Sequence, residues 1–428
     1  MKSSILKSSI PGLVEFPARF NKIPTGEGWV EGRRGVDGAE GLWRVNDGLY
    51  DLTNFVETHP GGSEWLTITK GTDITELFES HHLTDKAEKL LPKFYIRDAV
   101  KPRAVPLTFD KNGFYKKFKE RSMNALKNID FHRPSLKSNL LADSLAITTL
   151  FLCVITATTQ SRLALIIAGT SMTLATITGH NYFHMRDNFR MYYWDISLMS
   201  SREWRITHAM SHHMYPNTIW DYEILTFEPY FQYLPKIAAP ISRKFSWLYS
   251  PLVYLLAFYS QGIKRYIHIL LVRKKLEFRD VVPFIIPTVM FLATGDLQQI
   301  FKQWILIIGV ASFVFHVIGL NAAHHHPDIF HDGDNPRNDL DWGLLEMDAV
   351  RDREIVDDSY FLTLTQFGLH SLHHLMPTVD HAYLHLCLPA LEDTCREFGI
   401  GTRRFTPLEL IKGQFRQLRR VQVKTNYR

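Results

Sequence analysis

The chain has 428 residues, of which 45% are hydrophobic and 13% aromatic, and it carries 49 lysines and arginines against 44 acidic residues. This composition excludes a disordered chain and a collagen-like fibre, and the length allows two or three domains of about 150 residues each. The three cysteines are too few for a disulfide scaffold or a cysteine-rich metal site and are typical of a reducing compartment. The 20 histidines, many of them clustered, are the unusual feature.

The charge balance divides the chain into an acidic N-terminal part and a basic remainder. Residues 20–100 contain 14 acidic and 9 basic side chains, which leaves 30 of the 44 acidic and 40 of the 49 basic side chains elsewhere. We expect a first domain over 20–100, a linker and interfacial segment over 101–136, and a membrane domain over 137–428. The N-terminus has no long apolar segment followed by a cleavage site, so we expect no signal peptide.

Two histidine motifs in the first domain suggest a flat cofactor. A short strand is expected to enter a helix near residues 50–55, and His59-Pro60-Gly61-Gly62 then breaks the chain sharply, with glycines that let the backbone approach a ligand closely. A second expected helix, over 73–80, ends at His81-His82. Two imidazoles on opposite sides of a crevice can bind haem iron axially, which leaves electron transfer as the natural chemistry.

The motifs around these histidines resemble the cytochrome b5 domain over about residues 41–99. They are Trp43-Arg44-Val45, the run from Gly48 to Leu52, His59 to Gly62, Gly71 to Thr75, Phe78 to His82 and Phe94-Tyr95-Ile96. The resemblance implies a small α+β fold that binds haem b through His59 and one of the later pair. We expect His82, because the family often places its second ligand four residues or more after the phenylalanine, and His81 stays the alternative.

Long charge-free segments predict an all-α membrane domain with about four transmembrane helices. We expect two hairpins, formed by residues 140–159 with 163–183 and by 281–295 with 303–320. Basic runs precede both hairpins, and the positive-inside rule places these runs in the cytosol. The charge-free segment 245–263 is expected at the membrane interface, because a fifth crossing would put the last histidine cluster on the opposite side.

Four histidine-rich motifs follow the predicted spans and lie on one predicted membrane face. Helical i, i+4 spacing puts pairs of these side chains on a shared helix face. Imidazole-rich sites suit iron, zinc or copper, and ten ligands exceed what one ion can take, so we expect two metal ions. The ten candidate ligands are His180, His184, His208, His212, His213, Asn321, His325, His370, His373 and His374.

These motifs resemble the membrane fatty acid desaturase and hydroxylase superfamily, and Asn321 with His325 resembles the extra pair of acyl-CoA desaturases. The resemblance implies two non-haem iron ions that activate O₂ and remove hydrogen from an acyl lipid or acyl-CoA, with electrons from NADH-cytochrome b5 reductase through the fused haem domain. It also implies the endoplasmic reticulum membrane, with the haem domain and the histidine motifs facing the cytosol. No nucleic acid partner is expected. The whole arrangement most resembles the cytochrome b5-related proteins of insects.

Two features depart from the usual desaturase pattern. Three residues separate His208 from the pair His212-His213, where desaturases commonly have two, and this could shift His208 away from the metal. The third motif begins with His370, where fused front-end desaturases usually have glutamine, so no front-end regioselectivity is inferred. A lipid hydroxylase on the same scaffold and a non-catalytic, membrane-anchored haem carrier are therefore alternatives.

Other polar groups near the last motif are expected to be structural. His381 and His385 follow a complete histidine motif, and packing is favoured over metal binding for both. Six aspartates before this motif could support the histidines, although a solvated face is the expected arrangement; they are Asp339, Asp341, Asp348, Asp352, Asp357 and Asp358.

Overall fold

The N-terminal haem module, as we call residues 25–100, is a small α+β unit. The computed structural model describes residues 7–16, 25–228, 230–235 and 240–425. A three-stranded antiparallel sheet has the order β1-β2-β3. The elements of the module are α1 (Gly26–Val36), β1 (Trp43–Val45), β2 (Gly48–Tyr50), the 3₁₀ helix η2 (Thr53–Thr58), α2 (Ser63–Thr69), α3 (Thr75–His81), α4 (Lys86–Leu90), η3 (Leu91–Phe94) and β3 (Tyr95–Asp98).

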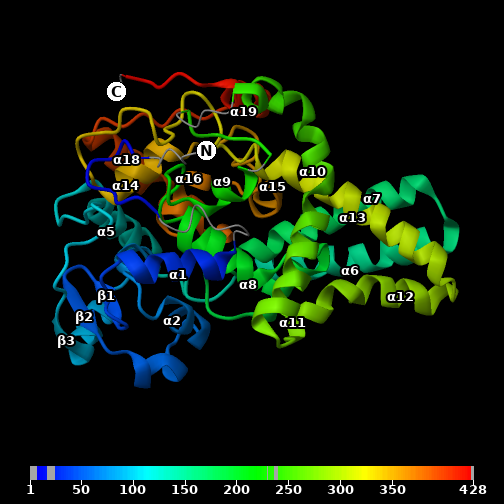
Figure 1. Ribbon diagram of the computed structural model, residues 1–428, viewed down its shortest axis with the longest axis horizontal. Coiled ribbons are helices and arrows are strands. Elements are labelled where there is room, and N and C mark those ends of the chain that lie inside the picture. The colour runs from blue at the N-terminus through cyan, green and yellow to red at the C-terminus, as the bar shows by residue number, and fades with distance from the viewer. Residues whose placement is uncertain (1–6, 17–24, 229, 236–239, 426–428) are drawn as a thin grey trace.

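Among the described residues of the second part, three helices are long and apolar enough to cross a bilayer: α6 (Leu136–Thr159), α7 (Arg162–His180) and α13 (Leu297–Gly319). Their outer faces carry exposed apolar side chains such as Leu140, Phe151 and Phe301, as expected of helices that face lipid. Figure 1 shows these helices side by side at one end of the molecule. The expected combination of a small α+β domain and a helical membrane domain is confirmed.

The fourth expected span, 281–295, is not one long helix. It is divided among α11 (Phe278–Val281), the 3₁₀ helix η8 (Val282–Phe284) and α12 (Ile285–Thr294). Pro283 and Pro287 lack the backbone N–H that a continuous helix needs, which explains the break. α12 still packs beside α6 at the same end of the molecule (Figure 1).

The segment 245–263, expected at the membrane interface, lies inside one long helix, α10 (Pro240–His268), that packs against α13. Tyr254 is only 3% exposed and accepts a hydrogen bond from Gln414, and the Tyr259 hydroxyl donates to the Ile305 carbonyl. These two aromatic side chains therefore make protein contacts in the structure.

The remaining elements form a cap at one end of the long helices. They are α5 (Phe114–Leu126), η4 (Phe189–Tyr193), η5 (Asp195–Ser197), α8 (Ser201–Trp204), the π-helix η6 (Arg205–His212), α9 (Tyr222–Phe227), the π-helix η7 (Ile269–Arg273), α14 (Trp342–Ala349), α15 (Tyr360–Thr365), α16 (His370–Leu375), α17 (His381–Leu384), η9 (His385–Cys387), α18 (Leu388–Glu397) and α19 (Pro407–Arg419). Within the range expected as a linker, α5 packs on α18 and α14, so this helix is an integral part of the cap.

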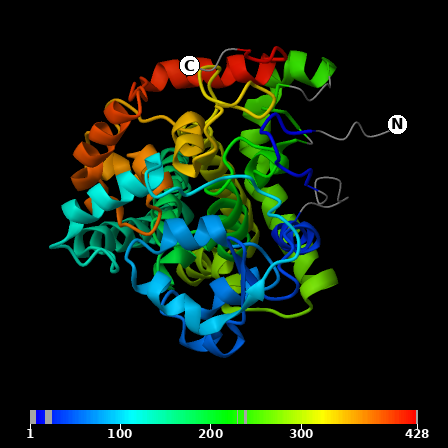
Figure 2. The same cartoon turned by 90° about the vertical axis from the view of Figure 1, so that its left-hand side faces the viewer.

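The haem module and the cap share one hydrophobic core. Trp43 and Phe78 of the module belong to the same buried cluster as Tyr215, Trp220 and Trp342 of the cap. In two perpendicular views the module lies on one side of the cap, with α19 on the opposite side (Figures 1 and 2). The fold therefore fixes the module against the part of the chain that carries the histidine motifs.

Candidate functional site

His59 and His82 face each other across the haem module. His59 follows η2, His82 caps α3, and their ring centres are 6.2 Å apart. The Nδ1 atom of His59 lies 2.9 Å from the Gly62 carbonyl oxygen, and that of His82 lies 3.0 Å from the Phe78 carbonyl oxygen. These carbonyls hold the proton on Nδ1, which leaves both Nε2 lone pairs free to bind a metal.

The spacing of this pair fits axial ligation of haem. An iron–nitrogen bond of about 2.0 Å, with about 1.1 Å from that nitrogen to the ring centre, places two axial imidazole centres about 6.2 Å apart. Phe55 lies against His59, and Phe78 lies against His82. Gly62 has φ of 109°, a value that favours glycine, so the turn after His59 depends on this residue. His59 and His82 could therefore hold haem b.

His81, the alternative ligand, faces the cap and not His59. Its ring lies 5.0 Å from that of Trp65 and 5.9 Å from that of His184 in the cap. Its Nδ1 atom lies 3.0 Å from the Ser80 hydroxyl, and its buried Nε2 atom has no hydrogen-bond partner among the described residues. The geometry therefore favours His82 as the partner of His59.

Five histidines in the cap form a first buried set whose ligand nitrogens all lie within 4.8 Å of one another. The Nε2 atom of His208 is 2.7 Å from that of His180 and 3.0 Å from that of His213. Two nitrogens bound to one ion at about 2.1 Å and about a right angle are about 3.0 Å apart. The set, which could hold one metal ion, consists of His180, His184, His208, His213 and His373.

A second set lies beside the first and consists of His212, His324 and His374. His370 joins it, because its Nε2 atom is 2.7 Å from the Nε2 atom of His324. The ring of His374 stacks on that of His213 at 4.0 Å, so the two sets are neighbours. Five histidines in the first set, three in the second and His370 make nine imidazoles, enough for two ions.

Carboxylates orient three of these imidazoles. Asp221 accepts from Nδ1 of His212 at 2.9 Å, Glu223 from Nδ1 of His208 at 2.7 Å, and Glu346 from Nδ1 of His374 at 2.8 Å. A carboxylate on Nδ1 fixes the ring so that Nε2 faces the metal and makes that nitrogen more basic. The sequence motifs carried no signal for these carboxylates beyond their nearness to the histidines.

The protonation states suit metal binding in two different ways. Burial, together with the neighbouring imidazoles, lowers the pKa of His184 and His373 well below its ordinary value, which favours the neutral form that binds metal. Burial also lowers the pKa of His212, but Asp221 and Glu223 outweigh it and raise this pKa to about 9. Metal binding at His212 is therefore expected to release a proton.

A π-helix accommodates the unusual spacing of the second motif. In η6 the backbone N–H of His213 donates to the His208 carbonyl, five residues back, at 2.9 Å. This hydrogen bond spans one residue more than its counterpart in an α-helix, so the wider turn absorbs the additional residue. His208, His212 and His213 all reach the two sets as a result. The sequence suggested that the additional residue could shift His208 away from the other candidate ligands, but in the structure His208 lies among those of the first set.

Asn321 and His325 lie outside both sets, and His324 stands in their place. Residues at i and i+4 share a face only in a continuous helix, but α13 ends at Gly319 and Ala323 has φ of 74°. The Asn321 amide donates to the Val317 carbonyl at 2.7 Å, and the His325 ring stacks on Tyr233 at 3.6 Å. Three consecutive histidines from His324 onward were the available signal, since a turn can aim any one of them inward.

The groups expected to be structural divide into two kinds. His385 is exposed, whereas His381 is buried with its ring 4.6 Å from that of His373 and its Nδ1 atom 2.8 Å from the Asn181 side-chain oxygen. In the acidic segment, Asp341 and Asp348 are buried rather than solvated. Glu346, which supports His374, comes from the same segment.

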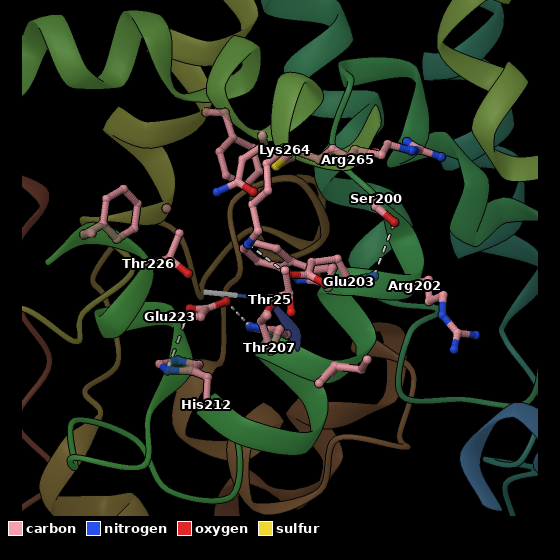
Figure 3. A pocket seen from close by; sticks show the side chains of 18 of the residues that line it. Thr25, Ser200, Arg202, Glu203, Thr207, His212, Glu223, Thr226, Lys264 and Arg265 are labelled. Atoms are coloured by element: carbon pink, nitrogen blue, oxygen red, sulfur yellow. Dashed lines mark hydrogen bonds and ion pairs between the residues drawn. The ribbon is translucent and has the colours of Figure 1, made fainter. Parts of the chain in front are cut away.

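An apolar pocket extends from the histidine sets toward α10. Its inner end is lined by His208, His212, His324 and His370, and its walls include Trp204, Phe315 and Phe367. Figure 3 shows Glu223 beside His212 and, further along the pocket, Lys264 facing Glu203. The Lys264 ammonium lies 2.9 Å from the Glu203 carboxylate. The pocket could therefore place an apolar chain against the metal ligands.

Replacing Glu346 with leucine is expected to weaken metal binding by about 10- to 100-fold, the usual effect of removing the partner of a ligating histidine. Leucine fills a similar volume but cannot accept the proton of His374 Nδ1. The measurement is the metal retained after dialysis against graded chelator concentrations. Glu354→Leu, at an exposed position, is the matched control, and equal retention in the two variants would show that Glu346 does not support the metal.

Comparisons with known proteins match both parts of the chain. The model "Fatty acid desaturase" matches residues 158–406, and "Cytochrome b5-like Heme/Steroid binding domain" matches residues 30–100. The chain is 44% identical over 414 residues to "Cytochrome b5-related protein" of Drosophila melanogaster, covering 95% of each chain. It is 25% identical over 439 residues to "Acyl-lipid (8-3)-desaturase B" of Dictyostelium discoideum, covering 88% of this chain and 90% of that one. No solved structure matches. The chain therefore belongs to the fatty acid desaturase family and carries an N-terminal cytochrome b5-like domain.

Proposed function

We propose that the protein catalyses O₂-dependent desaturation of a fatty acyl chain or a sphingolipid at two non-haem iron ions, with electrons supplied by its own haem module. The observation that carries this proposal is the pair of buried histidine sets at the inner end of an apolar pocket. The opposed imidazoles of His59 and His82, in a module that shares its core with the cap, support a tethered electron donor. A tethered donor acts at high effective concentration without diffusion of a separate carrier.

Three groups of side chains have different roles in the proposed reaction: the histidines, the apolar pocket walls and the carboxylates. Iron held by the nine histidines would supply O₂ activation and the removal of hydrogen from an unactivated carbon chain. Trp204, Phe315 and Phe367 line the pocket next to the histidines and would exclude water from the bound chain. Asp221 and Glu223 accept hydrogen bonds from Nδ1 of His212 and His208, and so would keep each Nε2 atom available to a bound iron ion.

Electrons would enter through NADH-cytochrome b5 reductase. Asp51 and Glu57 are exposed close to His59 in the chain, and they belong to the acidic surface of the haem module. An acidic surface favours encounter with a basic partner, chiefly by raising the association rate. The expected consequence is a reduction rate of the haem that falls as ionic strength rises.

The proposed location is the endoplasmic reticulum membrane, which the chain would cross several times. The length and apolar composition of α6, α7 and α13 support membrane crossing. Both α7 and α13 end close to histidines of the two sets, which supports one common face for the motifs. We propose that this face and the haem module are cytosolic, where NADH and the reductase are available.

Product analysis tests the proposed reaction. Purified protein with NADH, reductase and O₂ is offered labelled acyl-CoA, phospholipid and ceramide, and the products are identified by mass spectrometry. Desaturation removes two hydrogen atoms from the chain, whereas hydroxylation adds one oxygen atom. A product that lacks two hydrogens is the expected result. A hydroxylated product would replace the proposal with the hydroxylase alternative, and a protein with full haem and iron that converts none of these lipids would favour the carrier alternative.

A further inference from the structure

His81 links the two candidate cofactor sites. It is the covalent neighbour of His82, whose ring faces His59, and its own ring lies 5.9 Å from that of His184 in the first histidine set. Among the described residues, no other aromatic ring of the haem module is in ring contact with a histidine of either set. We infer that His81 positions the haem module for electron transfer and provides the contact through which electrons pass. They would pass from the haem pocket, which lies between His59 and His82, to the metal pocket, which the two histidine sets form. This inference rests on the proposed function.

Side chains of the haem module and of the cap contact one another around His81, and we call this contact region the junction. The ring of Trp65 lies 5.0 Å from that of His81, and the guanidinium of Arg205 lies over the Trp65 ring, 4.9 Å from its centre. Arg205 is fully buried and belongs to η6, the helix that also carries His208 and His212. One stack of side chains thus runs from the haem module into the helix of the second histidine motif.

Ion pairs hold the same junction in place. The carboxylate of Glu64, next to Trp65, lies 2.6 Å from Arg205, 3.1 Å from Arg202 and 3.0 Å from Arg279. These three arginines come from two separate segments of the chain beyond the haem module. Because charge-assisted contacts shared in this way restrict movement, the junction and the common core hold His81 against His184.

Packing alone does not explain a histidine at position 81. Its buried Nε2 atom has no hydrogen-bond partner among the described residues, and both ring nitrogens of His184 are likewise unpartnered there. An unpaired polar atom in a buried site costs stability, whereas phenylalanine would fill the same space without that cost. The contact of His81 with the metal pocket, which we infer to carry electrons, accounts for an imidazole at this position.

The electron count of the proposed transfer is simple. With haem held by His59 and His82 and iron held by the two histidine sets, each passage would oxidise the reduced haem by one electron and reduce the iron by one electron. Two passages serve one O₂-dependent turnover, and the reductase refills the haem with electrons from NADH. No bond forms or breaks at His81 in this transfer.

The test is the variant His81→Phe in the full-length, haem- and iron-loaded protein. Under anaerobic conditions without lipid, a flash-excited flavin with a sacrificial electron donor reduces the haem by one electron, and the haem absorbance follows the electron as it leaves for ferric iron. We expect this step to slow by about tenfold, which corresponds to about 1.4 kcal/mol in activation free energy. Haem content, haem midpoint potential and iron content are expected to stay unchanged, a combination that a purely structural role would not produce.

The controls separate this inference from the proposed function. His132→Phe, at an exposed position, is the matched substitution and should leave the rate unchanged. Glu64→Gln is a second variant that weakens the junction without altering either pocket, and it should also slow the step. A wild-type rate in His81→Phe would overturn the inference, because His81 would then take no part in electron transfer. Loss of haem or of iron would also overturn it, because His81 would then be a ligand itself. If the wild-type haem passed no electron to the iron, the proposed function would fail instead.

Discussion

Replacing His373 with alanine is expected to abolish lipid turnover and to leave the haem spectrum intact. His373 is buried in the first histidine set, where its Nε2 atom lies 3.1 Å from that of His180. Alanine would remove one of the proposed metal ligands, and an effect of more than about 100-fold on turnover is expected, since even the loss of a ligand's partner costs about 10- to 100-fold. The haem ligands lie in a different pocket and should not respond.

Product formation by mass spectrometry and the reduced haemochrome spectrum, taken from one sample, measure this result. His385→Ala is the matched control, because His385 follows the same motif but is exposed. It should retain wild-type turnover. Unchanged product formation in the His373→Ala variant would mean that the first histidine set does not hold the catalytic metal.

Replacing His59 with alanine is expected to remove the haem spectrum almost completely. His59 offers one of the two opposed Nε2 atoms, and without it the remaining imidazole of His82 leaves the iron with a vacant axial position. Iron bound in the cap should be unaffected, because the His59 side chain makes no contact with either histidine set among the interactions of the described residues.

The comparison of three variants also decides between His81 and His82. His82→Ala should lose haem as His59→Ala does, whereas His81→Ala should keep it. The measurements are the haemochrome spectrum and the non-haem iron content of each purified variant. A normal six-coordinate spectrum in His82→Ala, together with haem loss in His81→Ala, would reverse the ligand assignment.

Local sequence signals were enough to predict the two-part fold and most residues that the structure brings together. His59-Pro60-Gly61-Gly62 predicts a tight turn from its own residues, and the turn in the structure depends on the positive φ of Gly62. The third motif forms an α-helix, α16. The i, i+3 and i, i+4 spacing of His370, His373 and His374 therefore predicts their placement next to one another on this helix.

The sequence was less informative where the backbone leaves regular geometry. Spacing arguments assume an α-helix, but the second motif adopts a π-helix and the chain after α13 forms a turn. These two departures explain why His208 lies in the first histidine set and why His324, rather than His325, lies in the second. The carboxylates Asp221, Glu223 and Glu346 were not predicted, because their contacts with the histidines depend on tertiary packing.

The proposed enzyme depends most directly on one quantity, the number of non-haem iron ions per haem. Elemental analysis and the reduced haemochrome spectrum of one detergent-purified sample, expressed with adequate iron, give this ratio. Nine histidines in two sets and one pair of opposed histidines predict two non-haem irons per haem. A sample with full haem and no further iron would contradict the account and would leave the protein as a membrane-anchored electron carrier.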